Sequence, residues 1–240
     1  EFFLVHKNTD PDYELMPPRG RSGRREVARM SFSIDAVAEF EDFVEDMYDF
    51  ADEQALSVDT LIHENGAAQL EINFNHGDPL DMADQVFVFK RTVRETAQRH
   101  NMYATFMAKP MQKEPGSALH IHQSILSLVT GDNIFNGADD QPTPELMHYI
   151  AGLQRYTPDL ISFYAPNVNS YRRLAPDISA PINLSWGYDN RTTAFRVPDS
   201  TPINRRVENR FPGADANPYL AIAASLASCL LYTSDAADED

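Results

Sequence analysis

Residues 116–124 read Gly-Ser-Ala-Leu-His-Ile-His-Gln-Ser, and larger apolar side chains alternate here with polar ones. In an extended strand, side chains repeat every two residues. We therefore expect His120, His122 and Ser124 on one face of a strand and Leu119 and Ile121 on the other. Three polar groups would then share one surface, which could hold a metal ion, a nucleotide or only water.

Other short segments are also expected to be extended. They lie between four expected helices, without a strict alternation of strand and helix. Apolar spacing and capping residues predict helices at residues 35–56, at 79–100, from 143 onward and from 218 to about 232. Extended segments are expected at residues 103–111, 117–126, 182–188, 194–198 and 205–211. Because several strand pairs resemble hairpins, the sequence favours an α+β fold with an antiparallel sheet over a doubly wound fold.

The composition narrows the class of protein. A chain of 240 residues with 42% hydrophobic content can bury a substantial core. Its formal net charge of −16 argues against nucleic acid and anionic membrane as partners. The single cysteine, Cys229, excludes an internal disulfide and predicts a reducing compartment, the cytoplasm. No apolar run reaches the roughly 18–20 residues that span a bilayer.

The two ends of the chain suggest a piece of a larger protein. Glu1 opens directly on the apolar run Phe-Phe-Leu-Val, as the interior of a strand would. Residues 233–240 carry four acids and are interpreted either as a solvated acidic tail or as a cloning artefact. We therefore expect one partial domain over residues 1–232.

Charged residues recur at strand positions that would normally be apolar. Arg206, Glu208 and Arg210 share one face of the segment 205–211, and burying them requires partners or a ligand. An exposed sheet face is the alternative. Residues 172–210 contain seven arginines against four acids, which suits a small polyanion such as a nucleoside triphosphate. Surface arginines paired with nearby acids would explain the same composition.

Carboxylates elsewhere point to a metal site. Glu64 and Glu71 bracket a Gly-Ala-Ala turn, and with His120 and Glu208 they form a candidate ligand set. Several carboxylates with one imidazole suit Mg²⁺ or Mn²⁺, whereas zinc normally takes more histidine or cysteine. Taken singly, each glutamate could equally be a surface residue. A hard divalent ion beside arginines indicates phosphoryl chemistry.

Seven segments together resemble the catalytic domain of the glutamine synthetase family, in order from residue 1 to about 230. They are EFFLV, HENGAAQLEINF, KRTVRETAQRHNMYATFMAKPM, PGSALHIHQS, NSYRRL, NRTTAFRVP and RRVENRFPGADANPYLAIAA. The segments around residues 165–177, 186–192 and 204–225 look closer to the γ-glutamylputrescine synthetase branch, whose members join glutamate to amines other than ammonia.

The resemblance implies a curved, largely antiparallel sheet flanked by helices. It also implies an ATP-dependent ligase that phosphorylates the γ-carboxylate of glutamate, after which an amine displaces phosphate. The resemblance further implies that two Mg²⁺ or Mn²⁺ ions in each active site assist this reaction. Family members form homo-oligomeric rings of twelve in which a small N-terminal domain completes each site. Since that domain and the C-terminal part lie outside this sequence, we expect the isolated chain to be inactive.

Residue roles are implied position by position. Metal ligands would be Glu1, Glu64 and Glu71 for one ion, and His120 and Glu208 for the second. ATP would contact His122, Ser124, Arg191, Arg196 and Arg206, with Arg191 also acting catalytically on the transferring group. Glutamate would contact Gly116, Arg173 and Arg210.

Four positions bear on the substrates. Ser179 stands where ammonia-using members carry a glutamate that takes a proton from ammonium, although Asp177 could compensate. Pro115 replaces an asparagine found in many members, and Trp186 would line either an amine site or the core. We therefore expect an amine larger than ammonia, such as putrescine. Glutamine synthetase itself and an inactive metabolite-binding relative are the alternatives, and a zinc hydrolase is disfavoured.

Overall fold

A computed structural model of the chain describes residues 1–10, 12–27, 30–137, 139, 141–176 and 180–237, with side chains up to residue 229. The chain divides into two compact units, unit 1 from Glu1 to Ala118 and unit 2 from Leu119 to Asp240.

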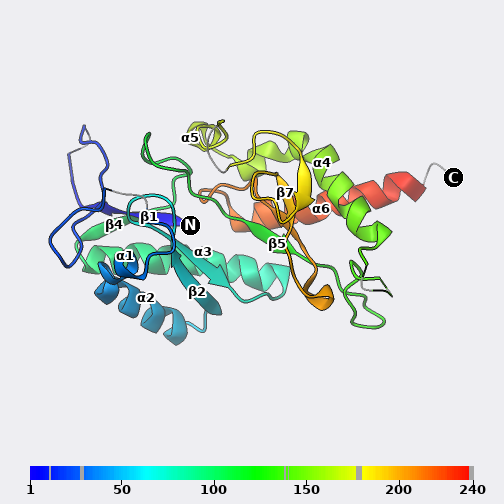
Figure 1. Cartoon of the computed structure of the whole chain (residues 1–240), viewed down its shortest axis with the longest axis horizontal. Helices are drawn as coiled ribbons and strands as arrows, with labels where there is room; N and C mark the ends of the chain where they lie inside the picture. Colours follow the sequence, from blue (N-terminus) through cyan, green and yellow to red (C-terminus); the bar gives the residue numbers. More distant parts are fainter. Residues whose placement is uncertain (11, 28–29, 138, 140, 177–179, 238–240) are drawn as a thin grey trace. The chain divides into compact units, whose positions relative to one another are not determined.

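Unit 1 is built on a four-stranded antiparallel sheet in the order β2-β3-β1-β4 (Figure 1). The strands are β1 (Phe2–His6), β2 (Val58–His63), β3 (Gln69–Phe74) and β4 (Met102–Thr105). The inner strand β1 is buried from Phe2 to Val5. A strand covered on both faces reads as a continuous apolar run, and the prediction of a strand interior after Glu1 is confirmed.

Three helices complete unit 1: α1 (Ile34–Ala38), α2 (Glu41–Glu53) and α3 (Pro79–Arg99). The predicted start of α3 is confirmed, because Asp78 accepts hydrogen bonds from the backbone N–H groups of Leu80 and Asp81. The single helix expected at 35–56 is wrong. It breaks at Phe40, which leaves helical geometry, and the preceding carbonyl of Glu39 accepts a hydrogen bond from the loop residue Arg21.

The apolar faces of α2 and α3 supply the core of unit 1. Phe43 and Met47 of α2 and Val93 of α3 are fully buried. The ring of Phe43 lies 6.3 Å from that of Phe2 in an edge-to-face contact. These contacts fix strand β1, and therefore the residue that precedes it, Glu1.

Unit 2 contains a second four-stranded sheet in the order β5-β8-β7-β6. The strands are β5 (Ile121–Gln123), β6 (Trp186–Tyr188), β7 (Phe195–Val197) and β8 (Val207–Asn209). β8 pairs antiparallel with β5 and β7, whereas β6 and β7 pair in parallel. A 3₁₀ turn spans Pro202–Asn204. The α+β class and the largely antiparallel pairing are confirmed.

Helices α4 (Pro144–Tyr164), α5 (Val168–Tyr171) and α6 (Pro218–Ala237) belong to unit 2. α4 and α6 contact each other, and one buried cluster joins them to the sheet through Leu146, Leu153, Phe195, Val207 and Ala221. α6 continues past the expected end at residue 232, because extending a formed helix costs little compared with nucleating one. No described helix is both long enough and apolar enough to cross a membrane.

Candidate active site

Strand pairing in unit 2 places three polar side chains in one row across the sheet. Glu208 on β8 stands opposite His122 on β5 and opposite Arg196 on β7. The neighbouring residues of β5, Ile121 and Gln123, are buried while His122 is exposed. The alternation predicted for this strand is therefore confirmed, and the row lies on the sheet face opposite the α4–α6 cluster.

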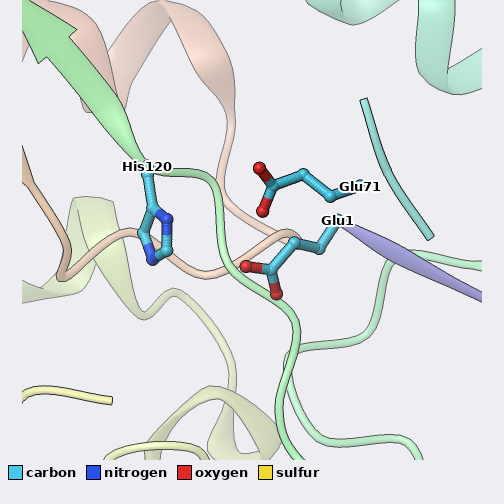
Figure 2. A group of neighbouring side chains, drawn as sticks. All are labelled: Glu1, Glu71 and His120. Carbon is cyan, nitrogen blue, oxygen red and sulfur yellow. The ribbon is translucent and has the colours of Figure 1, made fainter. Parts of the chain in front are cut away.

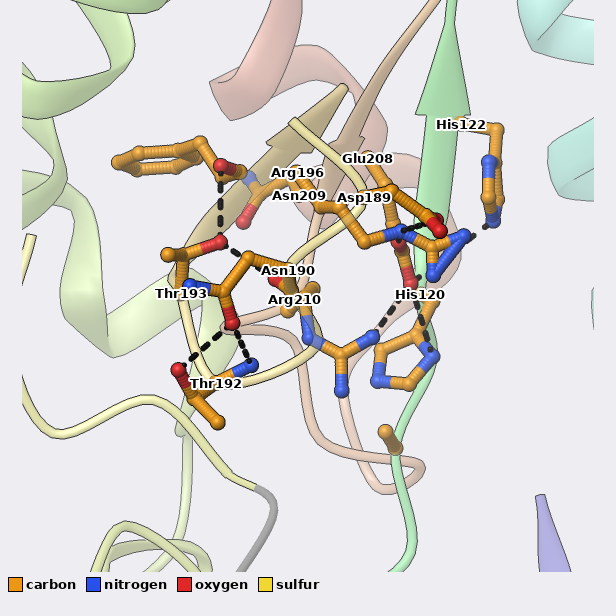
Figure 3. A network of polar contacts seen from close by, with 12 residues as sticks. His120, His122, Asp189, Asn190, Thr192, Thr193, Arg196, Glu208, Asn209 and Arg210 are labelled. Atoms are coloured by element: carbon orange, nitrogen blue, oxygen red, sulfur yellow. Dashed lines mark hydrogen bonds and ion pairs between the residues drawn. The ribbon is translucent and has the colours of Figure 1, made fainter. Parts of the chain in front are cut away.

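Glu208 is the centre of this row and is only 2% exposed. One carboxylate oxygen, Oε1, lies 2.7 Å from Arg210 Nη1 and 3.4 Å from His120 Nδ1 (Figure 3). The other oxygen, Oε2, lies 2.9 Å from Arg196 Nε. The expectation that charges on this strand are paired is confirmed, since an unpaired buried carboxylate would be costly.

The pairing around Glu208 is incomplete in one respect. Among the described residues, Glu208 Oε2 accepts no hydrogen bond of good geometry, and Arg196 Nε donates none despite its short distance. A buried carboxylate oxygen normally accepts at least one hydrogen bond or binds a cation. The arrangement therefore leaves a lone pair on Glu208 suited to a metal ion.

Both histidines near Glu208 are held in the neutral form. The His122 side chain is 39% exposed, and its partial burial lowers its pKa to about 4; Glu208 opposes this shift, while Arg206 and Arg196 reinforce it. The ring Nδ1 of His122 accepts from Arg206 Nε at 3.1 Å, which places its proton on Nε2. Burial, followed by the charge of Arg210, also holds the pKa of His120 well below its usual range. Neutral imidazole is the form that binds metals.

A tight turn between β6 and β7 presents Arg191. The side chain of Asn190 accepts from the backbone N–H of Thr192 at 3.0 Å and from its hydroxyl at 2.7 Å (Figure 3). Asp189 adopts a left-handed backbone with φ of 42°. Arg191 itself is exposed, as a residue that meets a ligand in solution must be.

The residues expected to bind glutamate are more deeply placed. Arg173 is 3% exposed, and its guanidinium donates to the backbone carbonyls of Arg210 at 2.7 Å and Phe211 at 2.8 Å. These bonds brace the end of β8. Whether the group also contacts glutamate stays a prediction, as do the roles expected for Ser124 and Gly116.

Of the positions that bear on the amine, Trp186 packs against the core of unit 2 and contacts Tyr188 at 5.5 Å between ring centroids. The structure thus favours a core role for Trp186. Asp177 and Ser179 lie outside the described residues.

Unit 1 gathers the predicted carboxylates. A carboxylate oxygen of Glu1 lies within 4.8 Å of one of Glu71. Figure 2 shows the side chains of Glu1 and Glu71. Burial raises the pKa of Glu1 to about 7; the charges of Glu71 and Glu64 act in the same direction, and the chain's terminal ammonium opposes them. A buried acid whose pKa is raised in this way is stabilised in its charged form by a cation, and an all-oxygen donor set fits Mg²⁺ or Mn²⁺.

Sequence reasoning missed the amides that support these groups. Gln69 and Asn209 are fully buried and bonded to other polar side chains, yet neither was given a role. The available signal was an amide at an inward-facing position of a strand, where an apolar residue is normally found.

Several known proteins resemble this chain in sequence. Residues 1–231 match the family model described as glutamine synthetase, catalytic domain. Curated relatives include "Gamma-glutamylputrescine synthetase PuuA" of Escherichia coli, 39% identical over 96% of this chain and 49% of the relative. "Glutamate--isopropylamine ligase" of a Pseudomonas species is 39% identical over 96% of this chain and 50% of the relative. A "Glutamine synthetase" of Pyrococcus abyssi is 36% identical over 94% and 48%.

A solved structure described as "Apo GmaS without ligand" matches with a TM-score of 0.80 and 29% identity, covering 98% of this chain and 52% of that one. The chain spans about half the length of the curated relatives named above. By its sequence and its fold, the chain belongs to the glutamine synthetase family and carries residues of the family's catalytic domain.

Proposed function

We propose that the protein containing this chain is an ATP-dependent ligase that joins the γ-carboxylate of L-glutamate to an amine. The observation that carries the proposal is the coexistence of two charge sets: the acids Glu1, Glu64 and Glu71 in unit 1, and the buried Glu208 among arginines in unit 2. The first set fits hard cations. The second offers both a metal ligand and positive charge for phosphates.

Glu1, Glu64 and Glu71 would hold one divalent ion, and His120 and Glu208 a second. Cations bound there would offset the negative charge of the phosphate oxygens. We infer Mg²⁺ or Mn²⁺ from the carboxylate-rich donors. Neutral His120 supports this assignment, because no proton must leave before it binds a metal.

The chain's own residues would act on ATP and glutamate as follows. His122 and Ser124, at the open face of β5, would contact the nucleotide, while Arg196 and Arg206 would bind its phosphates. Arg191, exposed on its turn, would stabilise the phosphoryl group as it moves to the γ-carboxylate. Phosphorylation gives an inert carboxylate a leaving group. The amine then attacks the acyl carbon, and the carbon–oxygen bond to phosphate breaks.

For the acceptor we propose an amine larger than ammonia, such as putrescine. Support comes from Ser179, which provides no carboxylate to deprotonate ammonium, and from relatives named for putrescine and isopropylamine. Relatives named glutamine synthetase have similar identity, so ammonia is the second candidate.

The product of the complete gene should be assayed for phosphate release with ATP, Mg²⁺, glutamate and either putrescine, isopropylamine or ammonia. We expect a higher kcat/KM for one of the two organic amines than for ammonia. A higher kcat/KM for ammonia would instead identify a glutamine synthetase. Binding of ATP and Mg²⁺ with no phosphate release from any amine would identify an inactive relative.

The Ser179→Glu variant sharpens this test. A carboxylate at that position should raise the rate with ammonia relative to putrescine, because it can bind and deprotonate ammonium. The matched control is Ser200→Glu, on the partly buried residue that follows β7 by three positions. An unchanged ratio of rates in Ser179→Glu would remove the argument for a larger amine that rests on Ser179.

The cytoplasmic location and the ring assembly also belong to this proposal. Family resemblance supports a homo-oligomer of twelve subunits. Sedimentation of the complete gene product at several concentrations would measure the assembly directly.

A further inference from the structure

The side chain of Gln69 lies at the junction of three segments of unit 1 that are far apart in sequence. It is 1% exposed, at the start of β3. Its amide oxygen accepts from Gly66 N–H at 2.9 Å. Its amide nitrogen donates to the carbonyl oxygen of Gly116 at 2.9 Å, to Ser117 Oγ at 3.2 Å and to Glu1 Oε2 at 3.3 Å.

The orientation of this amide is fixed by its partners. Gly66 offers an N–H donor and therefore requires the oxygen of Gln69, while Gly116 and Glu1 offer acceptors and require the nitrogen. Two amide hydrogens serve three acceptors, so at least one hydrogen is shared. No other amino acid of this size provides both the acceptor and the two donors.

The surroundings hold the amide in place. A Cβ atom added at Gly66 would lie 2.5 Å from the ring of Phe3 and 2.7 Å from the oxygen of Gln69, so the backbone at Gly66 approaches closer than any side chain allows. Ala68, in the same turn, has a left-handed φ of 55°. The turn between Glu64 and Glu71 is therefore shaped around Gln69.

Glu1 is held from a second direction. Its Oε2 also accepts from the backbone N–H of Ala118 at 2.8 Å, and its own backbone nitrogen donates to the Ala118 carbonyl at 3.0 Å. Oε2 is thus occupied by two neutral donors, and Oε1 is the oxygen left for a cation. The backbone of Ala118 and the side chain of Gln69 together set which oxygen of Glu1 that is.

We propose that Gln69 is a positioning residue that couples the metal-binding carboxylate of Glu1 to the segment of Gly116, which is expected to contact glutamate. The inference rests on the proposed function for the identity of both ligands. The structural part of the inference does not depend on those identities: without the amide donors of Gln69, neither Glu1 nor the Gly116 segment is held in position. Metal affinity and glutamate affinity then fall together, while ATP affinity at saturating Mg²⁺ does not.

The test uses Gln69→Glu and Gln69→Leu in the complete gene product. Gln69→Glu keeps the acceptor for Gly66 but replaces the donors with a carboxylate facing Glu1. Mn²⁺ binding is measured by calorimetry without substrates, and KM is measured separately for glutamate and ATP. The matched control is Gln154→Leu, which removes a partly buried hydrogen bond from the side-chain amide to the carbonyl of Leu184 in unit 2.

We expect both Gln69 variants to weaken Mn²⁺ binding and to raise KM for glutamate about tenfold or more, the effect of losing one charge-assisted hydrogen bond. KM for ATP should change less than about twofold, and Gln154→Leu should change none of the three. Equal losses of ATP and glutamate affinity, or Gln69 variants that bind Mn²⁺ like the parent, would overturn the proposal. Because Mn²⁺ binding needs no turnover, it decides the role of Gln69 even if no amine proves to be a substrate.

Discussion

The carboxylates of unit 1 and the carboxylate of unit 2 are stabilised in opposite ways. Within the described residues, Glu1 and Glu71 form no ion pair with lysine or arginine, and the donors to the Glu1 carboxylate are the backbone N–H of Ala118 and the side-chain amide of Gln69. Glu208 lies between Arg196 and Arg210. Glu1 and Glu71 of unit 1 are therefore suited to bind a cation, whereas the charge of Glu208 in unit 2 is largely neutralised by the neighbouring arginines.

This difference predicts that the acids of unit 1 matter mainly for function and that Glu208 of unit 2 matters mainly for stability. Where acids repel one another, removing one relieves strain in the folded chain but removes a ligand. Where an acid neutralises buried arginines, removing it leaves uncompensated positive charge. The same change of glutamate to glutamine should therefore have different consequences in the two units.

Glu208→Gln should give the largest effect. We expect it to lower the free energy of unfolding by about 3–5 kcal/mol, because Arg196 and Arg210 lose the charge that neutralises them in a buried site. Urea unfolding followed by circular dichroism measures this. Stability within about 1 kcal/mol of the parent would mean that water already screens the arginines.

Glu71→Gln should lower kcat/KM by about 100- to 1000-fold, because metal coordination contributes several kcal/mol to the transition state. Without metal, its stability should be unchanged or slightly higher, since the repulsion on Glu1 is relieved. Urea unfolding in EDTA and activity at saturating Mg²⁺ are the two readouts. Glu95→Gln, on the exposed face of α3, is the control and should change neither. A large loss of stability in Glu71→Gln would contradict the proposed difference between the two units.

Ser225→Ala tests the buried amides beneath the charged row. The Ser225 hydroxyl donates to Gln123 Oε1 at 2.5 Å and accepts from Asn209 Nδ2 at 3.1 Å, linking β5 and β8 to α6. Losing it leaves buried polar atoms without partners and should cost about 1–3 kcal/mol. Thr96→Val deletes a buried hydroxyl that bonds only a helix carbonyl in unit 1, and it should cost less than about 1 kcal/mol. Equal costs would show that Ser225 does not couple the strands.

His120→Ala and His122→Ala should give smaller effects that differ in kind. We expect His120→Ala to weaken Mn²⁺ binding and His122→Ala to raise KM for ATP, each by about tenfold, the value of a single polar contact. Calorimetry and initial rates distinguish them. If both variants lost metal and ATP affinity alike, the division of roles between the two rings would be wrong.

Much of this arrangement could be predicted from the sequence, because the spacing of apolar residues and the residues that cap helices are local features of the chain. Alternation placed His122 and Glu208 on strands, and Asp78-Pro79 located the start of α3. The break at Phe40 could not be predicted, because it depends on a hydrogen bond from Arg21, eighteen residues before Glu39. The resemblance supplied metal ligands and substrate contacts. It did not supply Gln69 or Ser225, whose roles arise only when distant strands meet.

The most direct test of the proposed ligase follows oxygen from glutamate to phosphate. Glutamate labelled with ¹⁸O in the γ-carboxylate is incubated with ATP, Mg²⁺, putrescine and the complete gene product, and the released phosphate is analysed by mass spectrometry. If the γ-carboxylate is phosphorylated before the amine attacks, each phosphate carries one labelled oxygen and each amide product retains the other. Unlabelled phosphate, or label in AMP, would contradict the account.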